Sequence, residues 1–373
     1  MPQACPRGRR MVAQPLHAPV RHGRRGSAPW RLTIRALPPA LALATTPAQA
    51  HVKWFAPYNV AADPTPLPVV FSGQFLILLA CTIVLIMLVH VADRVIEGGF
   101  RGDPFTQAFA ALAPQSADIM RITLGAFMLS LWLKGGIILT PELTTTNEAI
   151  SWLQLGLAAA TITWRTSWIA GLGILVLYGV AVGQYGIFHL LDYPLFLGIA
   201  AYIIIHSLKI ERLQPYALSI LYFAMAQTLL WASVEKWAFG AWTMPLLMQH
   251  ERITLGIDHR LYLTLAGYVE FVAAFLLLYG RTSQRLSALM LFAIFVAAVI
   301  DFGKIDAVGH AMIIASLLIV VINGNTTVNA ALQNRIPSFS LGSLEVAITY
   351  LGYVLLFFTF YYGAHGLIYG SLR

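Results

Sequence analysis

Charged side chains inside or at the ends of apolar segments are the residues of this sequence best suited to acid–base chemistry. Glu270 lies within one apolar segment, and Glu235 and Lys236 end the segment before it. A charge at mid-bilayer costs about 2.5–3.5 kcal/mol, so such a side chain is expected to face other helices or water. Glu270 lies about 15 Å along a helix from Arg281, which is too far for an ion pair, so it needs a partner on another helix or a bound proton. We predict catalytic roles for Glu270, Lys236, Glu235 and Lys134; the alternative for the two lysines is snorkelling from helix ends.

Two further groups of side chains are candidates for binding. Polar residues near helix ends are predicted to contact a substrate, namely Gln154, Asp192, Asp301 and Asp306. Histidines gather at the predicted outer face, and this favours a copper or zinc site there. The candidate ligands are His51, with its imidazole and free α-amine, His189 and His310. The alternative is that these are interfacial histidines with ordinary hydrogen bonds.

Membrane helices must position these side chains. The chain is 58% hydrophobic and 11% charged, far from the roughly 25% charged residues of soluble domains. Hydropathy predicts ten apolar segments, near 68–91, 118–138, 149–164, 167–187, 193–208, 215–237, 261–279, 285–302, 308–323 and 342–366. Several have fewer than the roughly 20 residues needed to cross a bilayer, which is typical of a compact bundle.

Two stretches indicate an internal repeat. Residues 152–167 (WLQLGLAAATITWRTS) and 268–283 (YVEFVAAFLLLYGRTS) each place a polar residue, Gln154 or Glu270, before an Arg-Thr-Ser triplet. Each stretch falls second in a group of four apolar segments. We therefore predict an all-α polytopic membrane protein of about ten transmembrane helices. Two parallel four-helix repeats would form its body, with one flanking helix at each end, because an even number of helices keeps repeats parallel.

The chain is expected to begin with an export leader. Residues 1–50 carry eight arginines and no acid, and Ala48-Gln49-Ala50 has the form of a cleavage site. The alternative is an uncleaved cytoplasmic tail. The expected parts are the leader (1–50), a periplasmic N-terminal segment (51–67), a first transmembrane helix and cytoplasmic connection (68–117), the repeats (118–208 and 215–324), and a cytoplasmic connection with a C-terminal transmembrane helix (325–373).

Charge predicts location and partners. The net charge of +8 comes entirely from the leader, since 16 basic and 16 acidic residues remain after it; a nucleic-acid partner is therefore not expected. Basic residues dominate the short loops that hold Arg165, Lys209 and Arg281, so these loops are predicted to be cytoplasmic. We expect a multi-pass protein of the bacterial inner membrane, with the lipid bilayer as its surroundings and a periplasmic mature N-terminus.

A resemblance to a known family rests on the second repeat. Its first helix ends in Val234-Glu235-Lys236, its second contains Gly267-Tyr-Val-Glu270, and an apolar run leads to Gly280-Arg281. This pattern resembles the DoxX-like family of four-helix membrane proteins. The first repeat is similar to it more weakly, through Arg121-x-x-x-Gly125 and Lys134. Members are associated with terminal quinol oxidase or thiosulfate:quinone oxidoreductase complexes. The resemblance implies a redox-linked membrane setting and supplies no catalytic residues.

Three functions stay open from the sequence. The first is a subunit or accessory factor of a quinone-linked redox system, with bound quinone, no cofactor of its own and a redox partner protein that supplies electrons. The second is a transporter of a metal ion or small solute that uses the outer histidines and acids. The third is a non-catalytic membrane assembly or scaffold protein.

Overall fold

The protein is helical throughout the part that the structure describes. The structure is a computed structural model, and it describes residues 52–100, 105–254, 256–333 and 338–370, which all belong to one compact unit. The predicted leader and His51 lie outside these residues. In the described ranges the one β pairing is an isolated bridge between Ile137 and Thr144. The prediction of an all-α protein is confirmed for these residues.

All ten predicted apolar segments coincide with helices. These are α2 (Gly73–Phe100), α4 (Ser116–Lys134), α5 (Glu148–Ala160), α6 (Trp164–Tyr185), α8 (Pro194–Ser207), α9 (Ala217–Ala238), α12 (His259–Tyr279), α13 (Thr282–Phe302), α14 (Lys304–Asn323) and α16 (Phe339–Tyr369). Eight of them are long and apolar enough to cross a membrane. The other two, α5 and α8, have 13 and 14 residues; they are about 20 Å long, shorter than a hydrocarbon core of roughly 30 Å. A multi-pass membrane protein is therefore confirmed, whereas ten full spans stay a prediction.

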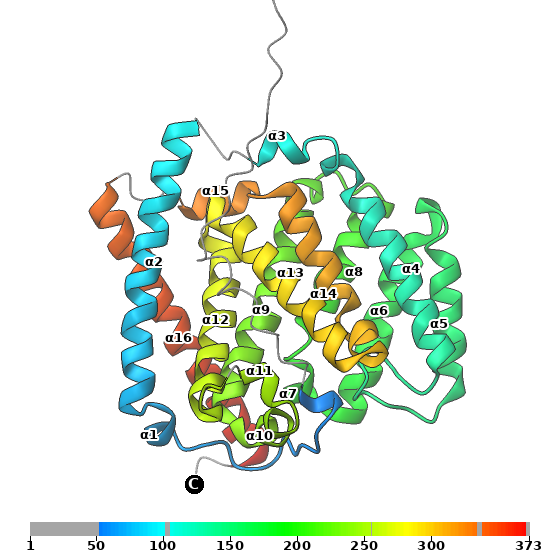
Figure 1. Cartoon of the computed structure of the whole chain (residues 1–373). Coiled ribbons are helices and arrows are strands. Elements are labelled where there is room, and N and C mark those ends of the chain that lie inside the picture. The colour runs from blue at the N-terminus through cyan, green and yellow to red at the C-terminus, as the bar shows by residue number, and fades with distance from the viewer. Residues whose placement is uncertain (1–51, 101–104, 255, 334–337, 371–373) are drawn as a thin grey trace, which may run out of the picture. The chain divides into compact units, whose positions relative to one another are not determined.

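Short helices lie at both ends of the long ones (Figure 1). One end holds α1 (Leu67–Val70), α7 (Ile187–Leu190), α10 (Gly240–Gln249), α11 (Glu251–Thr254) and the 3-10 helix η2 (Val52–Trp54); the other holds α3 (Thr106–Phe109) and α15 (Thr327–Gln333). Two further 3-10 helices, η3 (Ala113–Gln115) and η4 (Gln214–Tyr216), precede α4 and α9. Residues 52–66, called the strap below, run along the first end, which we call the strap side.

The long helices pack as two groups of four. In the first group α4 packs on α5, α5 on α6 and α6 on α8; in the second α9 packs on α12, α12 on α13 and α13 on α14. The first helix of each group also packs on the last helix of the other, so α4 contacts α14 and α9 contacts α8. Both first helices start at the end opposite the strap, where Asn323 Nδ2 donates to Ser116 Oγ (2.6 Å) and Ser219 Oγ donates to Thr326 Oγ1 (2.8 Å). The two groups therefore run in the same direction.

The flanking helices α2 and α16 pack against each other and against the second group. Asp93 on α2 accepts hydrogen bonds from the backbone N–H groups of Arg281 and Ser283 (both 2.8 Å) and from Ser283 Oγ (2.6 Å). Arg281 also pairs with Glu97 (Nη1–Oε2 2.7 Å). The free N–H groups that begin a helix favour an anionic partner, so Asp93 joins α2 to the start of α13.

A candidate ligand-binding pocket

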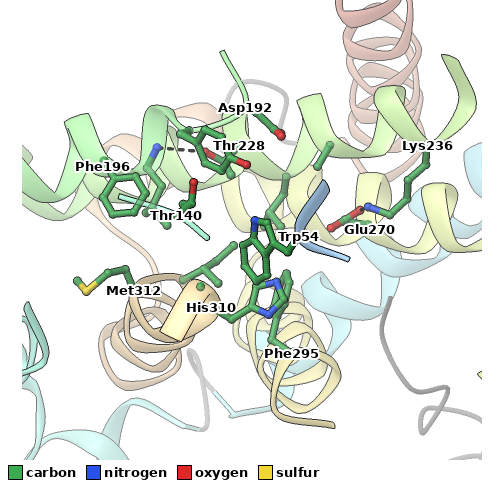
Figure 2. A pocket seen from close by; sticks show the side chains of 16 residues that line it. Trp54, Thr140, Asp192, Phe196, Thr228, Lys236, Glu270, Phe295, His310 and Met312 are labelled. Atoms are coloured by element: carbon green, nitrogen blue, oxygen red, sulfur yellow. Dashed lines mark hydrogen bonds and ion pairs between the residues drawn. The ribbon is translucent and has the colours of Figure 1, made fainter. Parts of the chain in front are cut away.

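A pocket lies where the two helix groups meet at the strap side, and it comprises about 600 Å³ of space when the part open to solvent is counted. The first group contributes Thr140, Asp192 and Phe196, and the second contributes Thr228, Lys236, Glu270, Phe295, His310 and Met312 (Figure 2). Further apolar walls come from Leu195, Leu229 and Ile313. The strap adds Trp54, which Figure 2 shows next to His310. The pocket therefore combines apolar surface with a few convergent ionisable groups, a combination typical of ligand sites.

One ionisable pair on the pocket wall joins α9 to α12. Lys236 Nζ lies 2.5 Å from Glu270 Oε2, and the two side chains are 19% and 15% exposed. Lys236 falls in the last turn of α9, and Trp237 beside it donates from its indole N–H to Thr264 O on α12 (3.2 Å). Gly267 lets this indole approach, because a Cβ there would lie 2.4 Å from Trp237 Nε1. The partner that Glu270 needs is thus Lys236, on a neighbouring helix.

A second pair stands on α14. His310 Nδ1 and Asp306 Oδ2 are 2.9 Å apart, as an i, i+4 spacing on a helix allows, and both residues are buried. Among the described residues, Asp306 Oδ1 has no hydrogen-bond partner. The His310 ring packs between Trp54 (ring centroids 4.5 Å apart) and Phe295 (4.7 Å). The contact with Asp306 fixes the orientation of the His310 ring on the pocket wall.

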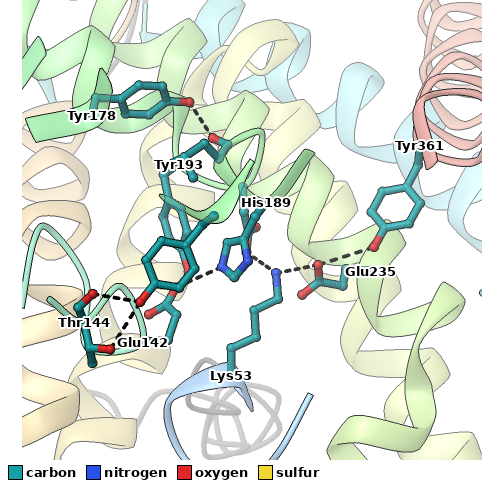
Figure 3. A network of polar contacts seen from close by, with 11 residues as sticks. Lys53, Glu142, Thr144, Tyr178, His189, Tyr193, Glu235 and Tyr361 are labelled. Atoms are coloured by element: carbon teal, nitrogen blue, oxygen red, sulfur yellow. Dashed lines mark hydrogen bonds and ion pairs between the residues drawn. The ribbon is translucent and has the colours of Figure 1, made fainter. Parts of the chain in front are cut away.

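A buried ion-pair network adjoins the pocket (Figure 3). Lys53 Nζ lies 3.0 Å from Asp192 Oδ2 and 2.7 Å from Glu235 Oε2, and the three side chains are at most 10% exposed. Tyr361 OH on α16 donates to Glu235 (3.4 Å). Burial alone would lower the pKa of Lys53, but the charges of Asp192 and Glu235 outweigh burial and hold this pKa above its ordinary value. Lys53 therefore bridges the two helix groups as a cation.

The network continues into the loop between α4 and α5. Tyr193 OH donates to Glu142 Oε1, and His189 Nε2 lies 3.8 Å from the same carboxylate oxygen. The His189 ring packs edge-on against Tyr58 of the strap (ring centroids 5.4 Å apart). Burial, and after it the charge of Glu142, raises the pKa of Tyr58 to about 12. Glu142, His189 and Tyr193 are buried, so this part of the loop is packed into the protein.

The structure brings only part of the predicted set of site residues to the pocket. The lining includes Glu270, Lys236, Asp192 and His310. Glu235 pairs with Lys53, and Asp306 pairs with the lining residue His310. Lys134 and Asp301 are exposed and do not line it. Gln154 is buried elsewhere, where its amide donates to Ile137 O (2.6 Å) and Ile138 O (3.0 Å) and holds the loop after α4. The functional roles of all these residues stay predictions.

Sequence reasoning missed Lys53, Trp54 and Glu142. Lys53 and Trp54 lie in a segment without helical periodicity, and Lys53 looks like an ordinary charge of the outer face. Glu142 follows Pro141 in a turn-like stretch, where a solvated acid is expected. The one available signal is that Lys53 is the single lysine between the predicted leader and Lys134.

No family model, curated protein or solved structure matches the chain. The resemblance to the DoxX-like family therefore rests on sequence motifs alone, those of the second repeat and, more weakly, those of the first.

The side chains that could bind a metal ion lie apart in the part of the chain that the structure describes. That part holds no group of three or more histidine, cysteine and acidic side chains arranged for a metal ion. His189 approaches Glu142, and His310 pairs with Asp306. Since His51 lies outside the described residues, the copper or zinc site stays a prediction.

Proposed function

We propose that this protein binds a quinone in the pocket, as a subunit or accessory factor of a quinone-linked redox system without a cofactor of its own. The observation that carries the proposal is that the pocket combines apolar walls with two ionisable pairs, Lys236–Glu270 and Asp306–His310. A quinone head has an apolar ring and two carbonyl oxygens at opposite positions. It therefore needs apolar surface and two hydrogen-bond donors.

Proton chemistry supports the same assignment. Reduction of a quinone to a quinol adds two electrons and two protons, one proton to each carbonyl oxygen. Lys236 with Glu270 would serve one oxygen, and His310 with Asp306 the other, each as a donor whose partner carboxylate orients it. The electrons would come from a separate redox protein. Phe196, Phe295 and Met312 would hold the ring and exclude water.

The setting of the pocket is part of the proposal. The reciprocal packing of α4 on α14 and of α9 on α8 is what two parallel repeats would produce, and it supports a duplicated DoxX-like unit. We infer an inner-membrane location with the strap side in the periplasm. The opposite side would be cytoplasmic, because its short connections hold Arg165, Lys209 and Arg281.

Quinone extraction tests the proposal directly. Protein purified in detergent is expected to carry a lipid quinone that organic extraction recovers. Glu270→Gln and Lys236→Met each remove a charge from the pocket, so recovery should fall about tenfold, the loss of one hydrogen bond to a charged group. The controls Glu211→Gln and Lys209→Met change exposed residues outside the pocket and should retain quinone. Absence of quinone from the native protein, together with no binding of added quinone, would rule out this function.

A transporter of a small solute is the second candidate. One observation favours it: residues of both helix groups line the pocket, and repeat interfaces are where many transporters hold their substrates. Uptake into proteoliposomes would distinguish it from quinone binding. A protein that neither binds quinone nor transports solutes would fit the scaffold role instead.

A further inference from the structure

Two threonines bring hydroxyl groups to the pocket wall. Thr140 lies in the loop between α4 and α5 and is 2% exposed, and Thr228 lies about halfway along α9. Figure 2 shows both on the Phe196 side of the pocket, away from the Lys236–Glu270 pair. The proposed proton transfer to the quinone carbonyls uses neither hydroxyl, so their place in the pocket needs a separate explanation.

Each hydroxyl has a proton that it can donate to a ligand. Thr140 Oγ1 is buried and has no hydrogen-bond partner among the described residues. Thr228 Oγ1 accepts the backbone N–H of Leu195 (3.0 Å), and it donates to no acceptor in the same part of the chain. A hydroxyl carries one donor beside its two acceptor lone pairs, so Thr228 can accept from Leu195 and still donate. Both threonines therefore offer a donor to an oxygen atom of a ligand.

The surroundings of the two hydroxyls are apolar. Phe196 and Met312 line the same side of the pocket (Figure 2), and Leu195 and Ile313 add further apolar surface. A ligand group that fits here combines an acceptor oxygen with an apolar body. A methoxy group on an aromatic or quinone ring has both features, because its ether oxygen accepts a hydrogen bond and its methyl packs against apolar side chains.

We propose that Thr140 and Thr228 select a benzoquinone that carries two neighbouring methoxy groups, with each ether oxygen accepting from one hydroxyl. This inference rests on the proposed function, because it assigns a class of quinone to the same pocket. The methoxy edge of such a ring lies between its two carbonyls, so the threonines do not compete with the donors to the carbonyl oxygens. A quinone with an apolar edge, such as the fused ring of a naphthoquinone, leaves both hydroxyls unpaired and binds more weakly.

Two quinones that differ only at this edge test the selection. One is 2,3-dimethoxy-5-methyl-1,4-benzoquinone and the other is 2,3,5-trimethyl-1,4-benzoquinone, and both carry the same decyl chain. They are titrated calorimetrically into detergent-purified protein that has been freed of bound quinone. The dimethoxy compound should bind about 25-fold more tightly, about fivefold for each neutral hydrogen bond. A naphthoquinone with the same chain should bind like the trimethyl compound.

Thr140→Val replaces the hydroxyl by a methyl group of nearly the same size. The preference should decrease from about 25-fold to about fivefold, through weaker binding of the dimethoxy compound alone. Because Thr140 Oγ1 has no partner among the described residues, the melting temperature should stay unchanged or rise, whereas a purely structural role would lower it. The matched control is Thr146→Val, which changes an exposed threonine of the same loop and should keep the full preference.

The outcomes separate this inference from the proposed function. Equal binding of the dimethoxy and trimethyl compounds, or an unchanged preference in Thr140→Val, would overturn the selection by the threonines and leave quinone binding in place. Binding of neither compound would overturn both.

Discussion

Lys53 shows at the residue scale why a buried charge depends on its partners. Its side chain is 1% exposed and pairs with two carboxylates that are 139 and 182 positions away in the chain. Removing an ammonium from water costs several kcal/mol, and two good ion pairs offset this cost only while both carboxylates stay in place. Glu270 pairs with Lys236 in the part of the chain that the structure describes, and its side chain is 15% exposed.

A double-mutant cycle measures the coupling of Lys53 with Glu235. We expect Lys53→Met to lower the free energy of unfolding by about 3–5 kcal/mol, because it removes the ammonium group that pairs with two buried carboxylates. Glu235→Gln should cost about 1.5–3 kcal/mol, since Lys53 keeps Asp192. The double variant should cost less than the sum of the single ones. Chemical denaturation is the measurement. Strict additivity would show that the two side chains do not interact.

The pH dependence of stability tests the charge state of Lys53. Its folded-state pKa lies above the ordinary value of 10.5. A raised pKa contributes stability in full below 10.5, and this contribution is lost as the pH rises toward the folded-state pKa. Lys53→Met/Asp192→Asn/Glu235→Gln removes every titrating group of the ion pairs. Its stability difference from the native protein should be constant from about pH 7 to about pH 9 and decrease above about 10.5. A decrease that begins below pH 9 would contradict the assignment.

At the element scale, α14 and the strap meet through a glycine. A Cβ at Gly309 would overlap the Trp54 indole, at 2.1 Å from Cη2. Gly309→Ala should therefore cost about 1–3 kcal/mol of stability, as overpacking does, and should loosen the strap. Trp54→Ala in the same chain should recover most of this loss. Gly179→Ala, on an α6 glycine with open space around it, is the matched control and should not destabilise. The measurement is thermal unfolding of the native protein, Gly309→Ala, Gly309→Ala/Trp54→Ala and Gly179→Ala.

The two Arg-Thr-Ser triplets differ in their hydrogen bonds to neighbouring elements. In the second group, Arg281 and Ser283 donate to Asp93 of α2, so the triplet anchors a flanking helix. In the first group, Ser167 Oγ donates within its own chain segment, to Thr163 O (2.7 Å), and Arg165 is exposed. The same three residue types thus begin a helix in both groups. Among the described residues, the second triplet makes long-range hydrogen bonds, whereas the hydrogen bonds of the first triplet are local.

At the scale of the whole molecule, the pocket depends on close approach of the two helix groups. A Cβ at Gly198 on α8 would lie 2.4 Å from Ala224 Cβ on α9. Gly198→Ala should push α8 from α9, lower stability by about 1–3 kcal/mol and weaken ligand binding in the pocket. Adding Ala224→Gly should restore the close approach of the two helices. It should also recover the lost stability, except for about 1 kcal/mol that a glycine costs within a helix. Gly156→Ala, on an α5 glycine without neighbours within 4 Å, serves as the control. Unfolding and ligand binding are measured in parallel, and loss of stability without recovery in the double variant would contradict this role of the interface.

The sequence by itself determined the helices, whereas Asp306 and His310 were assigned separate roles, substrate binding and metal binding, and were not predicted to pair. Hydropathy located the eight long helices and the shorter α5 and α8, because apolar runs in a membrane protein form helices that satisfy their own backbone hydrogen bonds. Asp306 and His310 stand four residues apart, a spacing that brings two side chains together on any helix.

Only the tertiary structure decided which distant residues meet. The sequence could not pair Glu270 with Lys236 or Lys53 with Asp192, because such pairs depend on how helices and loops pack around each other. It could not distinguish Gln154 from Glu270, because the two occupy matching positions in their repeats. In the structure Gln154 holds a loop, whereas Glu270 lines the pocket. Helix formation is governed by residues a few positions apart, whereas the pocket is governed by contacts between segments that are distant in the chain.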